Sequence, residues 1–240
     1  MEKKTKKLRD LKNELKRHAD ADQAKQMQRY FKTDKGEYGE GDIFLGLKAP
    51  VVRALMRDYV ALDLDDLEKL LKSGIHEERS VALAILRRKF ERAAEEERKS
   101  IFDFYIDHTE NINNWDLVDL SAPTIVGGYL LDKDRKILYE MARSENLWRR
   151  RISIISTFAF IKEGDCSDSL RIAEMLLDDK HDLIHKAVGW TLREVGKKDI
   201  AAEEKFLKKH GGNMPRTALR YAIEKFDAAK RRQYMSGGRG

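Results

Sequence analysis

Apolar residues recur at helical spacing through most of the chain. Near the start, Leu8, Leu11 and Leu15 fall three or four residues apart, which places them on one face of an α-helix. No sustained alternation of apolar and polar residues indicates a strand. We therefore predict two helices over residues 3–32, and about a dozen helices and no sheet in the whole chain.

Short polar or glycine-rich breaks separate the helical segments. The longest is the glycine-rich loop at residues 33–47, whose residues 33–42 are acidic. It lacks the Gly-Lys-Ser/Thr ending of a phosphate-binding loop and the ligand spacing of an EF-hand, so we interpret it as a tight turn. Pro50, at a first-turn position, predicts a new helix from Ala49. Residues 227–240 are predicted to form a frayed tail.

One interval recurs along the chain. Five residues that begin apolar helical stretches lie 36, 36, 35 and 30 residues apart, namely Arg79, Trp115, Arg151, Lys186 and Arg216. A period near 35 with two helical segments per unit is typical of a helical-repeat solenoid, in which equivalent helices line one concave surface. The pattern predicts an all-α solenoid that forms a single domain over residues 1–226. The five positions should form a stripe along its concave face.

The charge distribution favours a polyanionic partner. The chain has 240 residues, of which 38% are charged and 41% hydrophobic, and its formal net charge is +6 at pH 7. Eight Lys and Arg residues against three acids lie within Met1–Arg17, and a second cationic run covers residues 149–151. Such clusters suit nucleic acid, the commonest polyanion. The plainer interpretation is that most of these cations solvate exposed helix faces.

Several classes of site are disfavoured. The single cysteine, Cys166, excludes a disulfide or a thiolate metal cage within the chain and fits a reducing cytoplasm. The nearby acids Asp165 and Asp168 should raise its thiol pKa. His181 and His185 have helical zinc spacing but no third ligand is evident, so no metal is expected. The N-terminus lacks a signal-peptide apolar region, and no apolar run reaches the roughly 20 residues that span a bilayer.

One carboxylate and two tryptophans share the face of the stripe. Asp119 lies one helical turn after Trp115, and Trp190 lies one turn after Lys186. A carboxylate inside a helix needs a partner, and a structural ion pair with Arg151 explains Asp119 as well as a functional role does. Trp148 is interpreted as a core residue, whereas the register of Trp190 points to the stripe.

Several strings resemble one known family. They are M-Q-R-Y-F-K, N-N-W-D-L-V-D, W-R-R-R-I-S-I-I-S, H-K-A-V-G-W-T-L-R-E and M-P-R-T-A-L-R-Y-A-I-E-K. Together, and in this order, they are similar to the AlkD-type DNA alkylation-repair glycosylases from about Tyr30 to about Phe226. The resemblance implies a HEAT-like solenoid that grips duplex DNA in a concave basic cleft. It also implies excision of cationic N3- or N7-alkylated purines. The acidic 33–42 loop departs from the compact members, which lack it.

The resemblance assigns roles to individual residues. It implies that Trp115 and Trp190 form the family's aromatic pair, that Asp119 is its carboxylate, and that Arg151 is its arginine. It maps a DNA-contacting tyrosine to Tyr30. Arg151 is expected to hold phosphates together with three further cations: Arg150, Lys186 and Arg216.

The chemistry fits these residue types. Alkylation puts a positive charge on the purine, so the leaving group needs no general acid, and a carboxylate can stabilise the cationic sugar that forms.

We expect a cytoplasmic monomer, associated with the nucleoid when bound to DNA, that needs no cofactor, metal, membrane or protein partner. Two alternatives stay open: a non-enzymatic helical-repeat module that binds DNA or a protein, and an RNA-binding protein.

Overall fold

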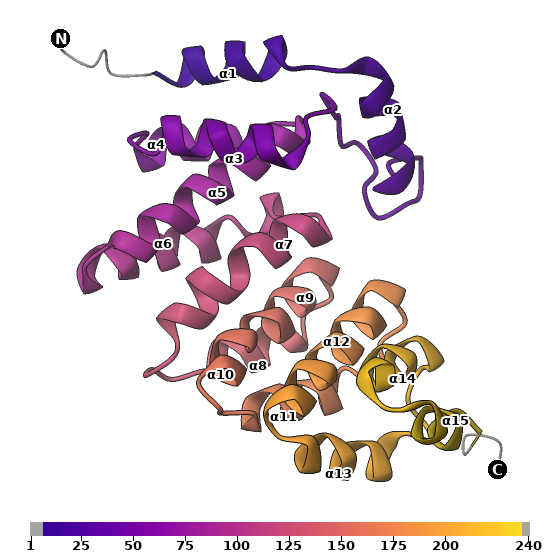
Figure 1. Cartoon of the computed structure of the whole chain (residues 1–240). Helices are drawn as coiled ribbons and strands as arrows, with labels where there is room; N and C mark the ends of the chain where they lie inside the picture. The colour runs from indigo at the N-terminus through magenta and orange to yellow at the C-terminus, as the bar shows by residue number, and fades with distance from the viewer. Residues whose placement is uncertain (1–6, 237–240) are drawn as a thin grey trace. The chain divides into compact units, whose positions relative to one another are not determined.

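The computed structural model describes residues 7–236, and their regular structure is helical (Figure 1). Within that range there are fifteen α-helices, short 3₁₀ and π turns, and one isolated bridge between Ile43 and Ile75. The all-α helical-repeat prediction is confirmed. Residues 3–6 of the first predicted helix lie outside the described residues. Every described helix is too short or too polar to cross a lipid bilayer.

The chain divides into two compact units, Met1–Ser121 and Ala122–Gly240, called here the N-terminal and the C-terminal unit. Stacked repeats contact only their neighbours, so such a division can arise within one solenoid. The single domain over residues 1–226 therefore stays a prediction.

The N-terminal unit contains the first seven helices and one 3₁₀ turn. They are α1 (Leu8–Arg17), α2 (Ala21–Tyr30), α3 (Ala49–Asp58), α4 (Leu64–Leu71), α5 (His76–Arg92), α6 (Glu95–Asp107), the 3₁₀ turn Thr109–Asn111 and α7 (Trp115–Ala122). Helix α1 buries Leu11 and Leu15, as its amphipathic pattern predicts. Helix α5 is buried along most of its length and packs against both α3 and α4. It is therefore the central helix of this unit.

The glycine-rich loop is fixed where it approaches α5. The backbone N–H groups of Leu45, Gly46 and Leu47 all donate to the carboxylate of Glu77, at 2.8–3.1 Å. Gly46 has a φ of 86°, and a Cβ there would lie 2.1 Å from the carbonyl oxygen of Asp20. Only glycine fits this approach. The interpretation of a tight turn between helices holds for this part of the loop.

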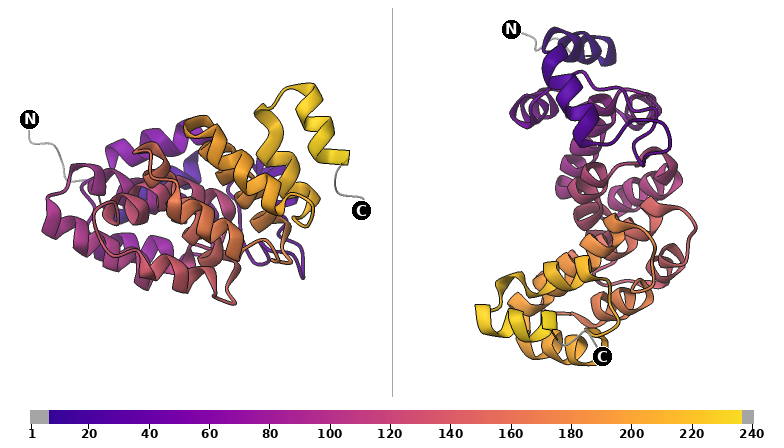
Figure 2. Two further views of the ribbon diagram at one scale, coloured as in Figure 1. Left: turned by 90° about the horizontal axis from the view of Figure 1, so that it is seen from below. Right: turned by 90° about the vertical axis from the view of Figure 1, so that its right-hand side faces the viewer.

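The C-terminal unit contains the remaining helices. They are the π turn Pro123–Gly127, α8 (Lys136–Ala142), α9 (Leu147–Ser156), α10 (Phe158–Lys162), α11 (Ser167–Met175), α12 (Asp182–Lys198), α13 (Ile200–His210), α14 (Arg216–Ala222), the 3₁₀ turn Ile223–Lys225 and α15 (Ala228–Ser236). Helices α12 and α14 lie side by side (Figures 1 and 2). A Cβ at Gly189 would lie 2.3 Å from the carbonyl oxygen of Ala218, so this contact requires glycine.

The predicted frayed tail at 227–240 is wrong for most of its length. Residues 228–236 form α15, and residues 237–240 lie outside the described residues. Asp227 accepts a hydrogen bond from the backbone N–H of Lys230 at the start of this helix. Lys230 lies 4.9 Å from the centre of the Phe226 ring and pairs with Glu204 of α13. A short polar sequence thus becomes helical through side-chain contacts that its composition does not reveal.

Glu203 on α13 is buried without a matching cation. Its side chain packs against Gly196 of α12, and its Oε1 atom has no hydrogen-bond partner. Burial, and then the charge of Glu204, raise the pKa of Glu203 to about 8 despite Lys230. The folded protein therefore keeps a proton on Glu203 at neutral pH, whereas the unfolded chain releases it above its ordinary pKa of 4.5.

Glu203→Gln should therefore stabilise the protein at alkaline pH. Wild-type stability should fall as pH rises from 4.5 to 8, since the folded state binds the extra proton over that range. The glutamine removes this loss, and at pH 8.5 its free energy of unfolding should exceed the wild-type value by on the order of 3 kcal/mol. Urea unfolding at several pH values measures this. Exposed Glu145→Gln is the control, and equal pH profiles for wild type and Glu203→Gln would contradict the assignment.

Candidate functional site

Two aromatic residues singled out in the sequence lie together in the N-terminal unit. Trp115 begins α7, where the Asn114 side-chain oxygen accepts a hydrogen bond from its backbone N–H at 2.9 Å. The Trp115 ring stacks on Phe31, with centroids 5.2 Å apart and planes 11° apart. Tyr30 meets the Trp115 ring edge-on at 5.9 Å and is 67% exposed. An exposed tyrosine beside a half-buried tryptophan suits contact with a planar ligand.

A buried charge network lies directly behind this aromatic cluster. The two ring nitrogens of His76 contact Asp42 at 3.2 Å and Asp116 at 2.8 Å. Arg79 and Asn114 donate to the same Asp42 carboxylate, at 2.6 and 3.3 Å. The network thus joins the acidic loop, α5 and the first turn of α7.

The electrostatics of the network keep His76 protonated. Burial alone lowers the pKa of His76, but the carboxylates of Asp116 and Asp42 outweigh it and raise the pKa to about 9. Burial likewise raises the pKa of Asp42, and here His76, Arg79 and Asn114 outweigh it, so the net shift is downward. At neutral pH the network therefore contains a cationic histidine held between two carboxylates.

The network corrects one sequence-based interpretation. Arg79 was expected to present its charge on the stripe, but it is 3% exposed and donates to Asp42 and to the Ser73 carbonyl. The reason is Asp42, which lies 37 residues earlier in the chain and pairs with it in the fold. Sequence reasoning missed Asp42 and His76 because one sits in a loop interpreted only as a turn and the other has no motif. The buried side of this loop fixes the start of α7.

Asp119 lies one turn further along α7 and is half-buried. Burial raises the pKa of the Tyr105 phenol on α6, and the nearby charge of Asp119 raises it further. The Tyr105 hydroxyl is 2.9 Å from the Ser121 hydroxyl. Asp119 is in the N-terminal unit and Arg151 in the C-terminal unit, so their ion pair stays a prediction.

The C-terminal unit carries the other aromatic residue of the predicted site. Trp190 on α12 is half-buried, meets Phe158 edge-on at 4.7 Å, and donates from its ring nitrogen to Glu194 at 3.1 Å. Its ring is therefore held in one orientation and partly exposed. Trp148 is 7% exposed, which confirms its place in the core.

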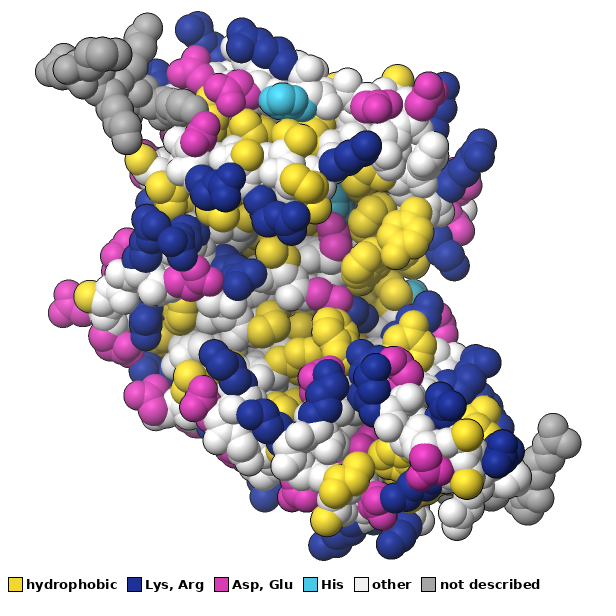
Figure 3. Space-filling view, in the orientation of Figure 1, with side chains coloured by type: hydrophobic (Ala, Val, Ile, Leu, Met, Phe, Trp, Pro, Cys, Tyr) yellow, Lys and Arg dark blue, Asp and Glu magenta, His cyan; other side chains and the backbone are white. Residues whose placement is uncertain are grey.

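The predicted phosphate-binding cations of this unit differ in their surroundings. Arg151 on α9 is 4% exposed and donates to the Leu183 carbonyl at 2.7 Å. Lys186 pairs with Asp182 at 2.7 Å, and exposed Arg216 donates to the Met235 carbonyl at 2.6 Å. On the face of the molecule that Figure 3 draws, Lys and Arg side chains are interspersed with Asp and Glu. A partly exposed ion pair such as Lys186–Asp182 is weak, and among the described residues Arg216 bonds only to a backbone carbonyl, so both cations can exchange these partners for a phosphate.

Arg150 has a different role from the one expected. Its Nε and Nη2 atoms donate to Asp179, and its Nη1 donates to the carbonyls of Ser144 and Glu145. All three guanidinium nitrogens thus tie α9 to neighbouring loops. We leave Arg150 out of the proposed phosphate contacts.

The groups considered for metal or thiol chemistry have structural partners. His181 caps α12 by accepting from the Leu183 N–H, and His185 contacts the Asp179 carbonyl at 2.6 Å. Within residues 7–236 no three His, Cys, Asp or Glu side chains are grouped to hold a metal ion. Burial first, and then Asp199 and Asp165, raise the pKa of Cys166, which confirms the expected direction.

The comparisons with known proteins agree with the fold and the motifs. The chain belongs to the DNA alkylation repair enzyme family, whose model matches residues 11–226. Its fold resembles that of a predicted DNA alkylation repair enzyme from Enterococcus faecalis, with a TM-score of 0.68 and 18% identity over 88% of this chain and 98% of that one.

Two structures from Streptococcus mutans are also similar. AlkD2 gives a TM-score of 0.53 at 18% identity, covering 85% of this chain and 98% of its own. The protein smu.31 gives 0.54 at 17% identity, covering 92% and 99%. A comparison with curated proteins finds no match. Family membership supports a role in DNA repair with DNA as the partner.

The Asp42 network should be a main source of stability in the N-terminal unit. Asp42→Asn removes the charge that Arg79 and His76 share, and should lower the free energy of unfolding by about 3 kcal/mol, because it leaves buried cations uncompensated. Glu40→Gln, in the exposed part of the same loop, should change it by about 0.5 kcal/mol or less. Urea unfolding compares the two, and equally small effects would show that the network contributes little.

Proposed function

We propose that this protein is a DNA glycosylase that hydrolyses the N-glycosidic bond of cationic N3- or N7-alkylated purines in duplex DNA, the opening step of base excision repair. The observation that carries the proposal is the arrangement on α7. There Asp119 lies one turn from Trp115, and the buried network that contains Asp116 fixes the start of the helix. Family membership supports the substrate class, since alkylated DNA is what such an enzyme repairs.

Asp119 is the proposed catalytic group. Breaking the bond to a cationic purine leaves positive charge on the deoxyribose, and a fixed carboxylate stabilises that charge as it develops. It can also orient the attacking water. The cationic base leaves without a proton from the enzyme, so a single carboxylate is sufficient.

The aromatic residues and the cations have separate proposed roles. Trp115 and Trp190 bracket the lesion nucleotide with their ring faces, which favour a cation by roughly 0.5–2 kcal/mol each, and Tyr30 contacts the DNA beside Trp115. Lys186 and Arg216 contact phosphates and set the position of the duplex. Arg151, which the sequence predicts as a third phosphate contact, is 4% exposed and donates to the Leu183 carbonyl, so the proposal does not include it among these contacts. In this proposal the protein acts on duplex DNA as a cytoplasmic monomer without a cofactor.

The substrate range tests the proposal. Single-turnover reactions with otherwise identical duplexes, each with one lesion, should release 7-methylguanine and 3-methyladenine but leave uracil and hypoxanthine in place. A neutral base needs a proton to leave, and Asp119 does not supply one. Free base or abasic-site cleavage is measured. Efficient uracil release would refute the leaving-group argument. Tight binding with no release from any lesion would favour a DNA-binding module without catalysis.

Asp119→Asn tests the catalytic assignment. Its charge acts mainly in the transition state, so the variant should lose about 10²–10³-fold in the rate of 7-methylguanine release while its duplex affinity stays the same. The control is Asp107→Asn, at an exposed position of α6, which should match wild type. Equal release rates for Asp119→Asn and wild type would disprove the proposed mechanism.

A further inference from the structure

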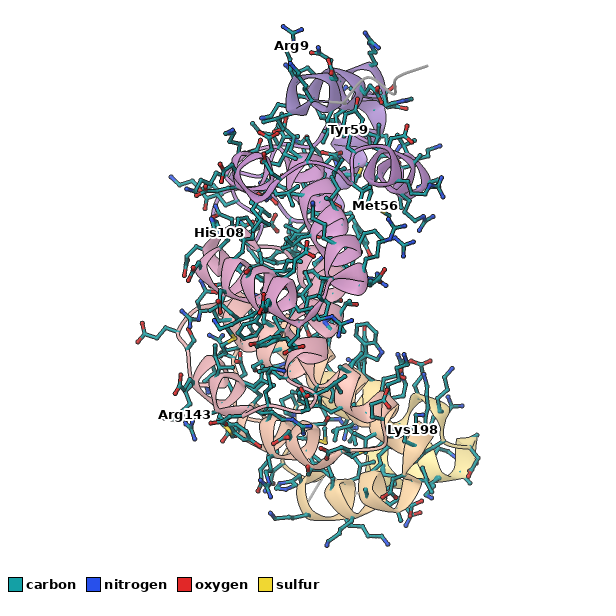
Figure 4. All side chains as sticks on the ribbon, turned by 90° about the vertical axis from the view of Figure 1, so that its left-hand side faces the viewer. Arg9, Met56, Tyr59, His108, Arg143 and Lys198 are labelled. Atoms are coloured by element: carbon teal, nitrogen blue, oxygen red, sulfur yellow. The ribbon has the colours of Figure 1, made fainter. Side chains whose placement is uncertain are left out.

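A groove of about 560 Å³ opens in the N-terminal unit between α2, α3, α5 and α7. Its walls are mainly apolar and include Met27, Val52, Met56 and Leu120. Figure 4 labels Met56 on α3, together with Tyr59, the residue that follows this helix, whose hydroxyl instead donates to Glu14 of α1. A groove of this size and lining is typical of a small-ligand site.

Guanidinium groups line the rim of the groove. Arg53 and Arg57 lie one turn apart on α3 and so project from the same face of that helix. No carboxylate within residues 7–236 forms an ion pair with either of them. On the opposite wall Arg87 and Arg88 share the single carboxylate of Glu91, at 3.1 and 3.0 Å. The rim therefore has unmatched positive charge.

The interior of the groove also has a polar group with no internal partner. The Ser80 hydroxyl lines the groove from α5, and among the described residues it makes no hydrogen bond. The groove continues to the aromatic cluster, because Phe31 lines it and also stacks on Trp115. Its occupant should thus combine an apolar body with a strong anion and one or two hydrogen-bonding atoms.

A nucleotide has this combination. Its base has two flat π faces that pack against apolar side chains, its base edge and sugar offer hydrogen-bonding atoms, and its phosphate matches the planar donors of arginine. Unstacked bases in protein grooves are held by apolar and aromatic side chains while cations follow the backbone. A fatty carboxylate shares the apolar body but needs only one cation, whereas this rim offers two guanidinium groups on α3 alone.

We propose that this groove binds one unstacked nucleotide of a DNA strand, with its base between the walls that carry Val52 and Met56 and its phosphate on Arg53 and Arg57. The inference rests on the DNA binding of the proposed function, but it does not depend on excision. It extends the interface to α3, beyond every residue of the predicted stripe.

The test uses an undamaged duplex with one bulged 2-aminopurine nucleotide, and the same duplex with a bulged abasic analogue. Wild type should bind the 2-aminopurine duplex about tenfold more tightly, since burying one base in such a site contributes about that factor. The bound base should also change its fluorescence. Equal dissociation constants and unchanged fluorescence would overturn the proposal.

Matched variants show whether the effect comes from the groove. Val52→Trp fills it and should abolish the preference for the bulged base, while Ala54→Trp, at an exposed position of α3 outside the groove, should keep it. The Arg53→Ala/Arg57→Ala double variant should weaken binding of both duplexes, unlike Arg92→Ala at the end of α5. Thermal unfolding confirms that each variant is folded. A preference that survives Val52→Trp would disprove the assignment.

Two further probes show which class of ligand the groove binds. Deoxyadenosine monophosphate that competes with the bulged duplex in wild type, but not in Val52→Trp, would extend the site to free nucleotides. Decanoate that binds in the groove while the bulged base gives no advantage would make it an amphiphile site and refute the proposal. If wild type shows no preference for the bulged base but releases 7-methylguanine normally, this inference alone is refuted. If wild type prefers the bulged base but releases no 7-methylguanine, only the excision mechanism is refuted.

Discussion

A buried carboxylate is unfavourable unless its oxygens are occupied by donors, and Asp42 meets that condition with three of them. Arg79, His76 and Asn114 all contact it, and His76 extends the network to Asp116 on α7. Because Asn114 also caps the backbone of Trp115, the orientation of the first turn of α7 follows from this charge balance. Asp119, one turn further along, inherits its position from the same contacts. The proposed catalytic residue therefore depends on a loop residue that has no chemical role of its own.

The elements that repeat in sequence were predictable. The interval near 35 residues and the apolar faces of segments such as α1 indicated an all-α repeat fold, and the family model covers residues 11–226. The sequence did not predict which charged side chains are buried in ion pairs, because their partners lie far away in the chain. Arg79 occupies the register of the stripe yet is buried by its pair with Asp42, and Arg150 is held by Asp179. Helix α15 formed from a segment whose composition predicted fraying, because Lys230 meets both Phe226 and Glu204.

In the candidate site, too, contacts within one helix were predictable and contacts between distant segments were not. Helical spacing alone placed Asp119 on the face of Trp115, since both lie on one helix. The stacking of Trp115 on Phe31, and the groove that Phe31 also lines, involve helices that are separated by long stretches of sequence. Trp190 was expected on the stripe, and it lies half-buried on α12 beside Phe158. The preceding Gly189 lets α14 approach α12 closely, so a glycine that the backbone requires and a proposed aromatic DNA contact occupy adjacent positions.

The acidic loop has two parts with different freedom to change in evolution. Its end is fixed by Asp42, and the backbone N–H groups of residues 45–47 that follow it donate to Glu77. Its tip makes hydrogen bonds mainly within itself, as between Gly36 and Glu40. Lengthening a loop whose ends stay fixed adds only a small entropic cost, about 0.6 kcal/mol for each doubling. Insertions and deletions at this tip can therefore accumulate among relatives without moving α7. Selection can reshape the tip of this loop while the position of the proposed catalytic Asp119 on α7 stays unchanged.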